Sequence, residues 1–115
     1  MTRETGLEVS VEQRGDVVIL RPVGDVDLNC SPTLRAELIQ AQEAKPSKLI
    51  VDLAEVHYMD SSGVATLVEA MKGMRQLGGA LVLCSLQERV LSIFEIARLD
   101  IVFNIVADLE AALQD

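Results

Sequence analysis

Aromatic residues, histidine and cysteine are scarce in this 115-residue sequence. Aromatic residues make up 3% of it and tryptophan is missing, so a hydrophobic core has to be aliphatic. One histidine, His57, gives too few ligands for a zinc site. Cys30 and Cys84 lack CxxC spacing, which predicts buried, reduced thiols in a cytoplasmic protein. We therefore expect neither a metal nor a cofactor.

Basic residues are also few. Lys and Arg total 10 against 18 Asp and Glu, which gives a formal net charge of −8. Such a surface repels nucleic acids and anionic membranes and favours a basic protein partner. Residues 1–6 lack the apolar core of a signal peptide. No run approaches the roughly 20 apolar residues that span a bilayer, so we expect no membrane insertion.

Apolar residues make up 50% of the chain, which is enough for a substantial core. The length fits one domain, and we expect a single domain over residues 1–115. Residues 7–11 alternate as in a half-exposed strand, and residues 17–23 form a second strand after a Gly-Asp turn, so the two predict an antiparallel hairpin. Ser31 as cap and Pro32 as first helical residue then begin a helix.

The rest of the chain alternates between strands and helices. The buried stripe of the first helix is predicted to be Leu34, Leu38, Ile39 and Ala41. The later elements are expected as an apolar, central strand 48–53, a helix 62–77, a strand 80–85, a helix around Val90–Ala97, a strand 101–106 and a helix 108–113. In the 62–77 helix, we expect Val64, Leu67, Val68, Met71 and Met74 to be buried, and Thr66, Glu69, Lys72, Arg75 and Gln76 to face solvent. This order predicts an α/β fold: a mixed, mostly parallel sheet of four to five strands with an N-terminal hairpin, packed with about four helices.

Residues 60–63, Asp-Ser-Ser-Gly, lie where the apolar strand ends and the long helix begins; we call them the DSSG turn. Unpaired amides and a partial positive charge at a helix N-terminus favour an anion. A phosphate on Ser61 would add about −1.5 to −2 charge there, and Gly63 would keep the first turn open to a partner. On local sequence alone, Asp60 or Ser61 is better interpreted as a helix cap. The residues alone leave both interpretations open.

The segment 48–100 resembles the STAS domain, the fold of bacterial anti-sigma factor antagonists. The resemblance lies in the strand, the DSSG turn, the amphipathic helix, the Gly-Gly stop, the next strand and the helix ending in Leu99. The sequence GDVD at residues 24–27 resembles a second short motif of the family, so the likeness covers essentially the whole chain. Val64-Ala65 stands where many relatives carry Leu-Gly, a conservative change.

The resemblance implies a phosphorylation switch. The serine that directly follows the aspartate, here Ser61, would be phosphorylated by an anti-sigma factor with serine-kinase activity. The unphosphorylated protein would bind that factor and release a sigma factor, and a PP2C-type phosphatase would restore binding. Asp27, Asp60, Ser62 and Gly63 would form the phosphosite environment and partner surface. The protein would be no enzyme.

Some alternatives remain beside this interpretation. Asp27 is equally well interpreted as a carboxylate that solvates a loop, and Asp25 is better interpreted that way. A serine hydrolase lacks support, because there is no G-x-S-x-G elbow and no second histidine. A phosphoacceptor receiver domain needs a lysine after its last strand, and the last lysine here is Lys72. A STAS scaffold, or a subunit associated with a lipid or anion transporter, would keep the fold and bind its partner constitutively.

Overall fold

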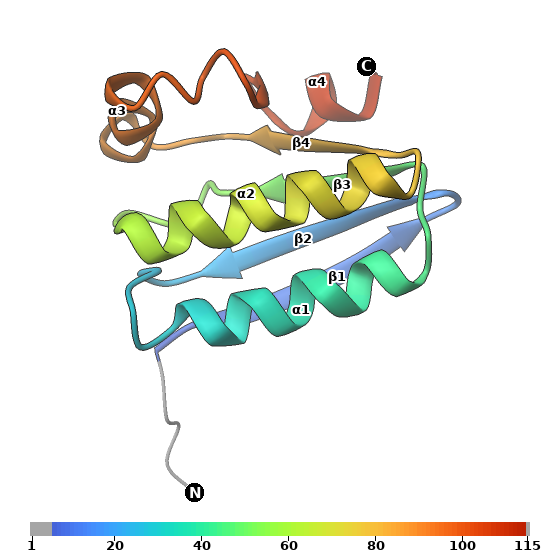
Figure 1. The fold of residues 1–115 in the computed structure, drawn as a ribbon, viewed down its shortest axis with the longest axis horizontal. Helices are drawn as coiled ribbons and strands as arrows, with labels where there is room; N and C mark the ends of the chain where they lie inside the picture. Colours follow the sequence, from blue (N-terminus) through green and yellow to red (C-terminus); the bar gives the residue numbers. More distant parts are fainter. Residues whose placement is uncertain (1–5, 115) are drawn as a thin grey trace, which may run out of the picture.

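The computed structural model describes residues 6–114 (Figure 1). Five strands and four helices are formed by these residues. The elements in chain order are β1 Glu8–Arg14, β2 Val17–Val23, α1 Ser31–Glu43, β3 Lys48–Asp52, α2 Ser61–Gln76, β4 Ala80–Cys84, α3 Glu88–Ile96, β5 Asn104–Val106 and α4 Leu109–Gln114. The predicted α/β fold is confirmed.

The five strands form one sheet in the order β1-β2-β3-β4-β5. β1 pairs with β2 as an antiparallel hairpin, and the other neighbours pair in parallel. β3 occupies the centre, as its apolar sequence predicted. The last strand is shorter than expected, because residues 101–103 form a turn in which the Val102 amide donates to the Leu99 carbonyl at 3.0 Å.

Successive strand residues point to opposite faces of the sheet. Leu49 and Val51 of β3 therefore join the larger core with α1, α2 and α3, whereas Ile50 joins a smaller cluster with Ala112 of α4. Figure 1 shows α1 and α2 lying side by side across one face. The predicted burial of Met71, Met74 and both cysteines is confirmed. Among residues 6–114, no helix has both the length and the apolar character that crossing a bilayer requires.

Several expectations for individual residues in the helices were wrong. Ser31 is the first residue of α1 and does not cap it, because Cys30 holds the cap position without a side-chain hydrogen bond. Ile39 is 45% exposed, since Leu34, Leu38 and Ala41 already define the buried face of α1. Thr66 is only 7% exposed, because α1 packs beside that face of α2. Ala97 lies beyond the end of α3 and is exposed.

Candidate functional site

Two connections lie side by side at the carboxyl ends of β2 and β3. Residues 24–30 lead to α1, and residues 53–60 lead to α2. The Val26 amide donates to the Tyr58 carbonyl at 2.9 Å, and the Asp60 amide donates to the Val26 carbonyl at 3.1 Å. The two sequence motifs, GDVD and the DSSG turn, are thereby brought together.

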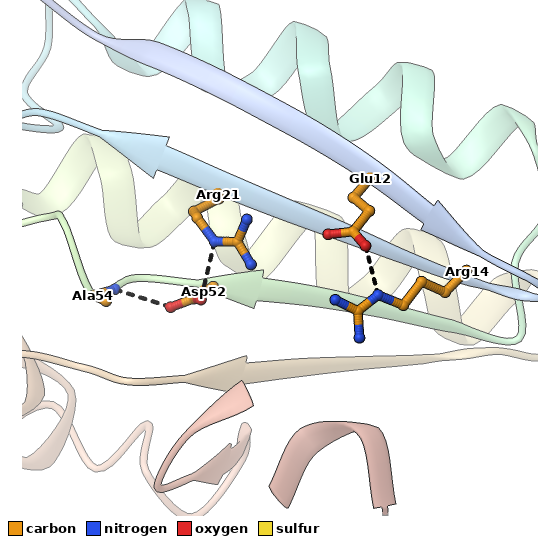
Figure 2. A network of polar contacts seen from close by, with 5 residues as sticks. All are labelled: Glu12, Arg14, Arg21, Asp52 and Ala54. Carbon is orange, nitrogen blue, oxygen red and sulfur yellow. Dashed lines mark hydrogen bonds and ion pairs between the residues drawn. The ribbon is translucent and has the colours of Figure 1, made fainter. Parts of the chain in front are cut away.

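Asp52, the last residue of β3, holds the start of the second connection. Its Oδ1 accepts the Ala54 amide at 3.1 Å, and its Oδ2 accepts Arg21 Nε at 3.2 Å (Figure 2). Gln87, which precedes α3, donates Nε2 to the Ala54 carbonyl at 2.6 Å. Side chains therefore hold both backbone polar groups of Ala54, which fixes the path toward the DSSG turn.

Asp60 is the N-cap residue of α2. Its Oδ1 accepts the Ser62 amide at 2.9 Å, the Ser62 hydroxyl at 2.6 Å and the Gly63 amide at 3.4 Å. The Ser62 hydroxyl is the main cause of a lowered pKa for Asp60; burial opposes it, and the amides of Gly63, Ser62 and Leu28 reinforce it. Of the two possible caps, Asp60 therefore fills the role and Ser61 does not.

Three backbone amides at this end of α2, where unpaired amides were expected, already have partners. The amides of Ser62 and Gly63 donate to the Asp60 carboxylate, and the Val64 amide donates to the Asp60 carbonyl at 3.2 Å. The negative charge that suits a helix N-terminus is thus supplied by Asp60. A phosphate on Ser61 would lie beside this carboxylate, where like charges repel.

The two serines of the DSSG turn differ in exposure and bonding. Ser61 is exposed, and its hydroxyl makes no hydrogen bond to any residue that the structure describes. Ser62 is half-buried and donates its hydroxyl to Asp60. Ser61 therefore offers the accessible nucleophilic oxygen of the pair.

Gly63 was expected to leave the first turn of α2 open to a partner, but its free side faces the protein interior. A Cβ atom there would lie 2.7 Å from Met59 Cγ and 2.8 Å from Val26 Cγ1. Both neighbouring side chains are buried. The absence of a side chain at Gly63 therefore allows the helix start to pack against the two connections.

Asp27 stabilises the turn before α1. Its Oδ1 accepts the amides of Asn29 and Cys30, each at 3.1 Å, and its carbonyl accepts the Ser31 amide at 2.8 Å. Asp25 is exposed. These bonds agree with the interpretation of Asp27 as a loop carboxylate; its place in a phosphoserine site stays a prediction.

Two exposed apolar side chains near the DSSG turn were not predicted from the sequence as part of the site. Leu28 is 73% exposed and Tyr58 is 46% exposed. Beside Tyr58 lies a cavity of about 270 Å³ that is lined by His57, Tyr58, Met59, Arg89, Val90 and Ile93. An apolar residue directly after GDVD, and another two positions before Asp60, were the available signals.

Two further reactive side chains are the Cys84 thiol and the His57 imidazole. Burial raises the pKa of the Cys84 thiol to about 11, so the thiol stays protonated near neutral pH. His57 is exposed, as expected. Between residues 6 and 114, no three His, Cys, Asp or Glu side chains gather as metal ligands would.

Known proteins resemble this chain over nearly its whole length. The family model described as the STAS domain matches residues 8–112. The anti-sigma-B factor antagonist of Bacillus subtilis (strain 168) is 32% identical over 108 residues, covering 94% of this chain and 98% of the relative.

Two solved structures share the fold. An anti-sigma factor antagonist from Mycobacterium paratuberculosis has a TM-score of 0.88 at 20% identity, covering 95% of this chain and 92% of that one. The Bacillus cell fate determinant SpoIIAA in its phosphorylated form has a TM-score of 0.70 at 21% identity, covering 90% of this chain and 96% of that one. With a family model that matches nearly its whole length, the chain belongs to the STAS domain family.

Proposed function

We propose that this protein is an anti-sigma factor antagonist controlled by phosphorylation of Ser61. The unphosphorylated form binds an anti-sigma factor with serine-kinase activity, so that a sigma factor is released. Phosphorylation prevents this binding, and a PP2C-type phosphatase reverses it. The protein works in the bacterial cytoplasm as a binding regulator of transcription and a kinase substrate, without catalysis of its own.

One observation carries the proposal: in a STAS domain, the capping aspartate is followed by an exposed hydroxyl that makes no hydrogen bond to any of residues 6–114. The anti-sigma factor antagonists among the relatives favour this role over a transporter-associated subunit. Leu28 and Tyr58 add exposed apolar surface beside the same turn, as protein interfaces often do. The surrounding acidic residues Asp25 and Glu55 suit a basic partner surface.

The free-energy cost expected from a phosphate in the interface is large enough to switch partner binding off. A hundredfold loss of affinity corresponds to about 2.7 kcal/mol. An unpaired charge in an interface built for a hydroxyl costs about 2–5 kcal/mol. This cost arises within the interface itself, so no refolding of the domain is required.

The test compares Ser61→Ala and Ser61→Asp with the wild type in calorimetric titrations against the anti-sigma factor of the same organism. Ser61→Ala should bind as the unmodified protein does and should accept phosphate at least about ten times more slowly than the wild type. Ser61→Asp should bind at least about a hundredfold more weakly. Ser10→Asp is the matched control, because it adds the same charge to an exposed position on β1.

Two results would contradict the proposal. Undiminished phosphate incorporation into Ser61→Ala would refute the site assignment. Equal binding by the wild type and by Ser61→Asp would refute the switch and favour a constitutive scaffold or transporter-associated role.

A further inference from the structure

The DSSG turn presents two neighbouring hydroxyls to any kinase that binds it. Ser61 is exposed and makes no hydrogen bond among the described residues. The Ser62 hydroxyl donates to Asp60 Oδ1 at 2.6 Å. Because the two side chains are chemically identical, their surroundings have to decide which one receives the phosphoryl group.

We propose that Asp60 selects the phosphorylation site by holding the Ser62 hydroxyl, so that Ser61 is the acceptor. This inference rests on the proposed function, since it concerns the kinase reaction at the same turn. In that reaction Ser61 Oγ attacks the γ-phosphorus of ATP bound by the kinase. An O–P bond forms, the bond from phosphorus to the β–γ bridging oxygen breaks, ADP leaves, and the hydroxyl proton passes to a base of the kinase.

Ser62 can react only after its hydroxyl leaves Asp60. The bond is short and has an ionised acceptor, which places it among the stronger hydrogen bonds of proteins. Breaking a bond of this kind should slow transfer to Ser62 by roughly tenfold to a hundredfold. Ser61 does not meet this barrier, since its hydroxyl is exposed and bonds to no residue in the described part of the chain.

The opposite effect, activation of Ser62 by Asp60 acting as a base, is disfavoured by the same contacts. The Ser62 hydroxyl and three backbone amides lower the pKa of Asp60 against the opposing effect of burial, and a carboxylate of low pKa is a weak base. Asp60 is also held in place, because Oδ1 accepts the amides of Ser62 and Gly63 in addition to the hydroxyl. Asp60 is therefore a positioning residue that acts through Ser62.

Two substitutions of Asp60 separate its bonding from its charge. Asp60→Asn keeps an oxygen where Oδ1 lies, so it should retain both the cap and the bond to Ser62. Asp60→Ser keeps a good helix cap but has a shorter side chain with one oxygen. That oxygen cannot reproduce the set of bonds that Asp60 accepts, so the Ser62 hydroxyl should be released.

The experiment phosphorylates the wild type and both variants with the partner kinase and ATP, and locates the phosphate by fragmentation mass spectrometry of the peptide that contains the DSSG turn. The wild type and Asp60→Asn should carry at least about ten times more phosphate on Ser61 than on Ser62. In Asp60→Ser this ratio should fall at least about fivefold, because the bond to Ser62 is lost. A purely structural role for Asp60 would lower total incorporation in Asp60→Ser and leave the ratio unchanged, which would overturn the inference.

If Asp60→Ser does not fold, the Ser61→Ala variant tests whether Asp60 selects the phosphorylation site. With Asp60 intact, Ser61→Ala should accept phosphate on Ser62 at least about ten times more slowly than the wild type accepts it on Ser61. Transfer to Ser62 near the wild-type rate would overturn the selection by Asp60. Absence of phosphate from both serines of the wild type would refute the proposed function itself, so the two failures are distinguishable.

Discussion

The N-termini of α1 and α2 start from similar sequences and present opposite surfaces. Each helix begins with a serine, follows a parallel strand and has an aspartate shortly before it. Ser31 of α1 is only 7% exposed, whereas Ser61 of α2 is exposed. The same residue type at the same helical position is therefore buried in one case and accessible in the other.

The position of the aspartate explains the difference. Asp60 directly precedes Ser61, and its carboxylate accepts the amides of Ser62 and Gly63 in the first turn of α2. No turn therefore separates this aspartate from the start of the helix. Asp27 precedes Ser31 by a three-residue turn and uses its carboxylate within that turn, on the amides of Asn29 and Cys30. Ser61, next to its capping aspartate, is exposed, whereas Ser31, separated from Asp27 by the three-residue turn, is buried.

The largest expected effect concerns binding at the exposed helix start. Leu28→Ala or Tyr58→Ala should each weaken binding of the anti-sigma factor by about tenfold or more, because exposed apolar side chains beside Ser61 are candidates for interface hot spots. Isothermal titration calorimetry measures the effect. Leu77→Ala is the matched control: Leu77 is 44% exposed but follows the other end of α2. Equal losses in all three variants would argue against a binding surface centred on Ser61.

The second prediction concerns packing under the same helix start. Gly63→Ala should lower the free energy of unfolding by about 1–3 kcal/mol, because the new methyl group overlaps the buried Met59 and Val26 side chains. Urea denaturation measures this change. Gly73→Ala, in the same helix, meets only the end of the flexible Gln42 side chain and should leave stability unchanged or raise it by up to about 1 kcal/mol. Similar losses of unfolding free energy in Gly63→Ala and Gly73→Ala would contradict a specific cost of overlap with Met59 and Val26.

The main elements were predictable because their signals are local. The alternation in residues 7–11 and the turn at Gly15-Asp16 indicated the hairpin of β1 and β2. The apolar run of β3 indicated its central position. Gly78 ends α2 with a φ of 81°, a conformation that glycine adopts without a steric penalty.

Features that depend on neighbouring elements were not predictable in this way. Thr66 donates its hydroxyl to the Ser62 carbonyl at 2.8 Å and is covered by α1, a neighbour that helical periodicity does not reveal. At the site, the sequence placed the DSSG turn at a helix start and left the choice between Asp60 and Ser61 as the cap open. The pairing of the Ser62 hydroxyl and the contact from the Leu28 amide did not follow from the sequence, because they depend on the orientation of Asp60 and on a distant segment.

The third prediction compares the two aspartates. Asp60→Ala should lower the free energy of unfolding by about 1–2 kcal/mol, and Asp27→Ala by about 1 kcal/mol, because each loses amide hydrogen bonds at a helix start. The loss should be greater for Asp60, since Asp60 also holds the Ser62 hydroxyl. Urea denaturation near neutral pH measures both variants. A greater loss for Asp27→Ala would reverse the assigned importance of the two carboxylates.

The fourth prediction concerns the pH dependence of the α2 cap. The pKa of Asp60 is lower in the folded protein than its ordinary value of about 3.9, mainly because of the Ser62 hydroxyl. The stability that ionised Asp60 contributes is therefore complete above the ordinary value and is lost as the pH falls through the folded-state pKa. The stability difference between the wild type and Asp60→Asn should be constant near neutral pH and shrink in acid. A difference that grows in acid would contradict the assigned bonds.

The smallest expected effects are those of the two serines on stability. Neither Ser31 nor Ser61 provides the helix cap, so Ser31→Ala and Ser61→Ala should each change the free energy of unfolding by less than about 0.5 kcal/mol. Replacing a serine that caps a helix by alanine would instead lower the free energy of unfolding by about 1 kcal/mol. Thermal and urea unfolding of both variants beside Asp27→Ala and Asp60→Ala distinguish these cases. A loss near that of the aspartate variants would show that the serine shares the cap, whereas two silent substitutions would show that folding does not constrain Ser61.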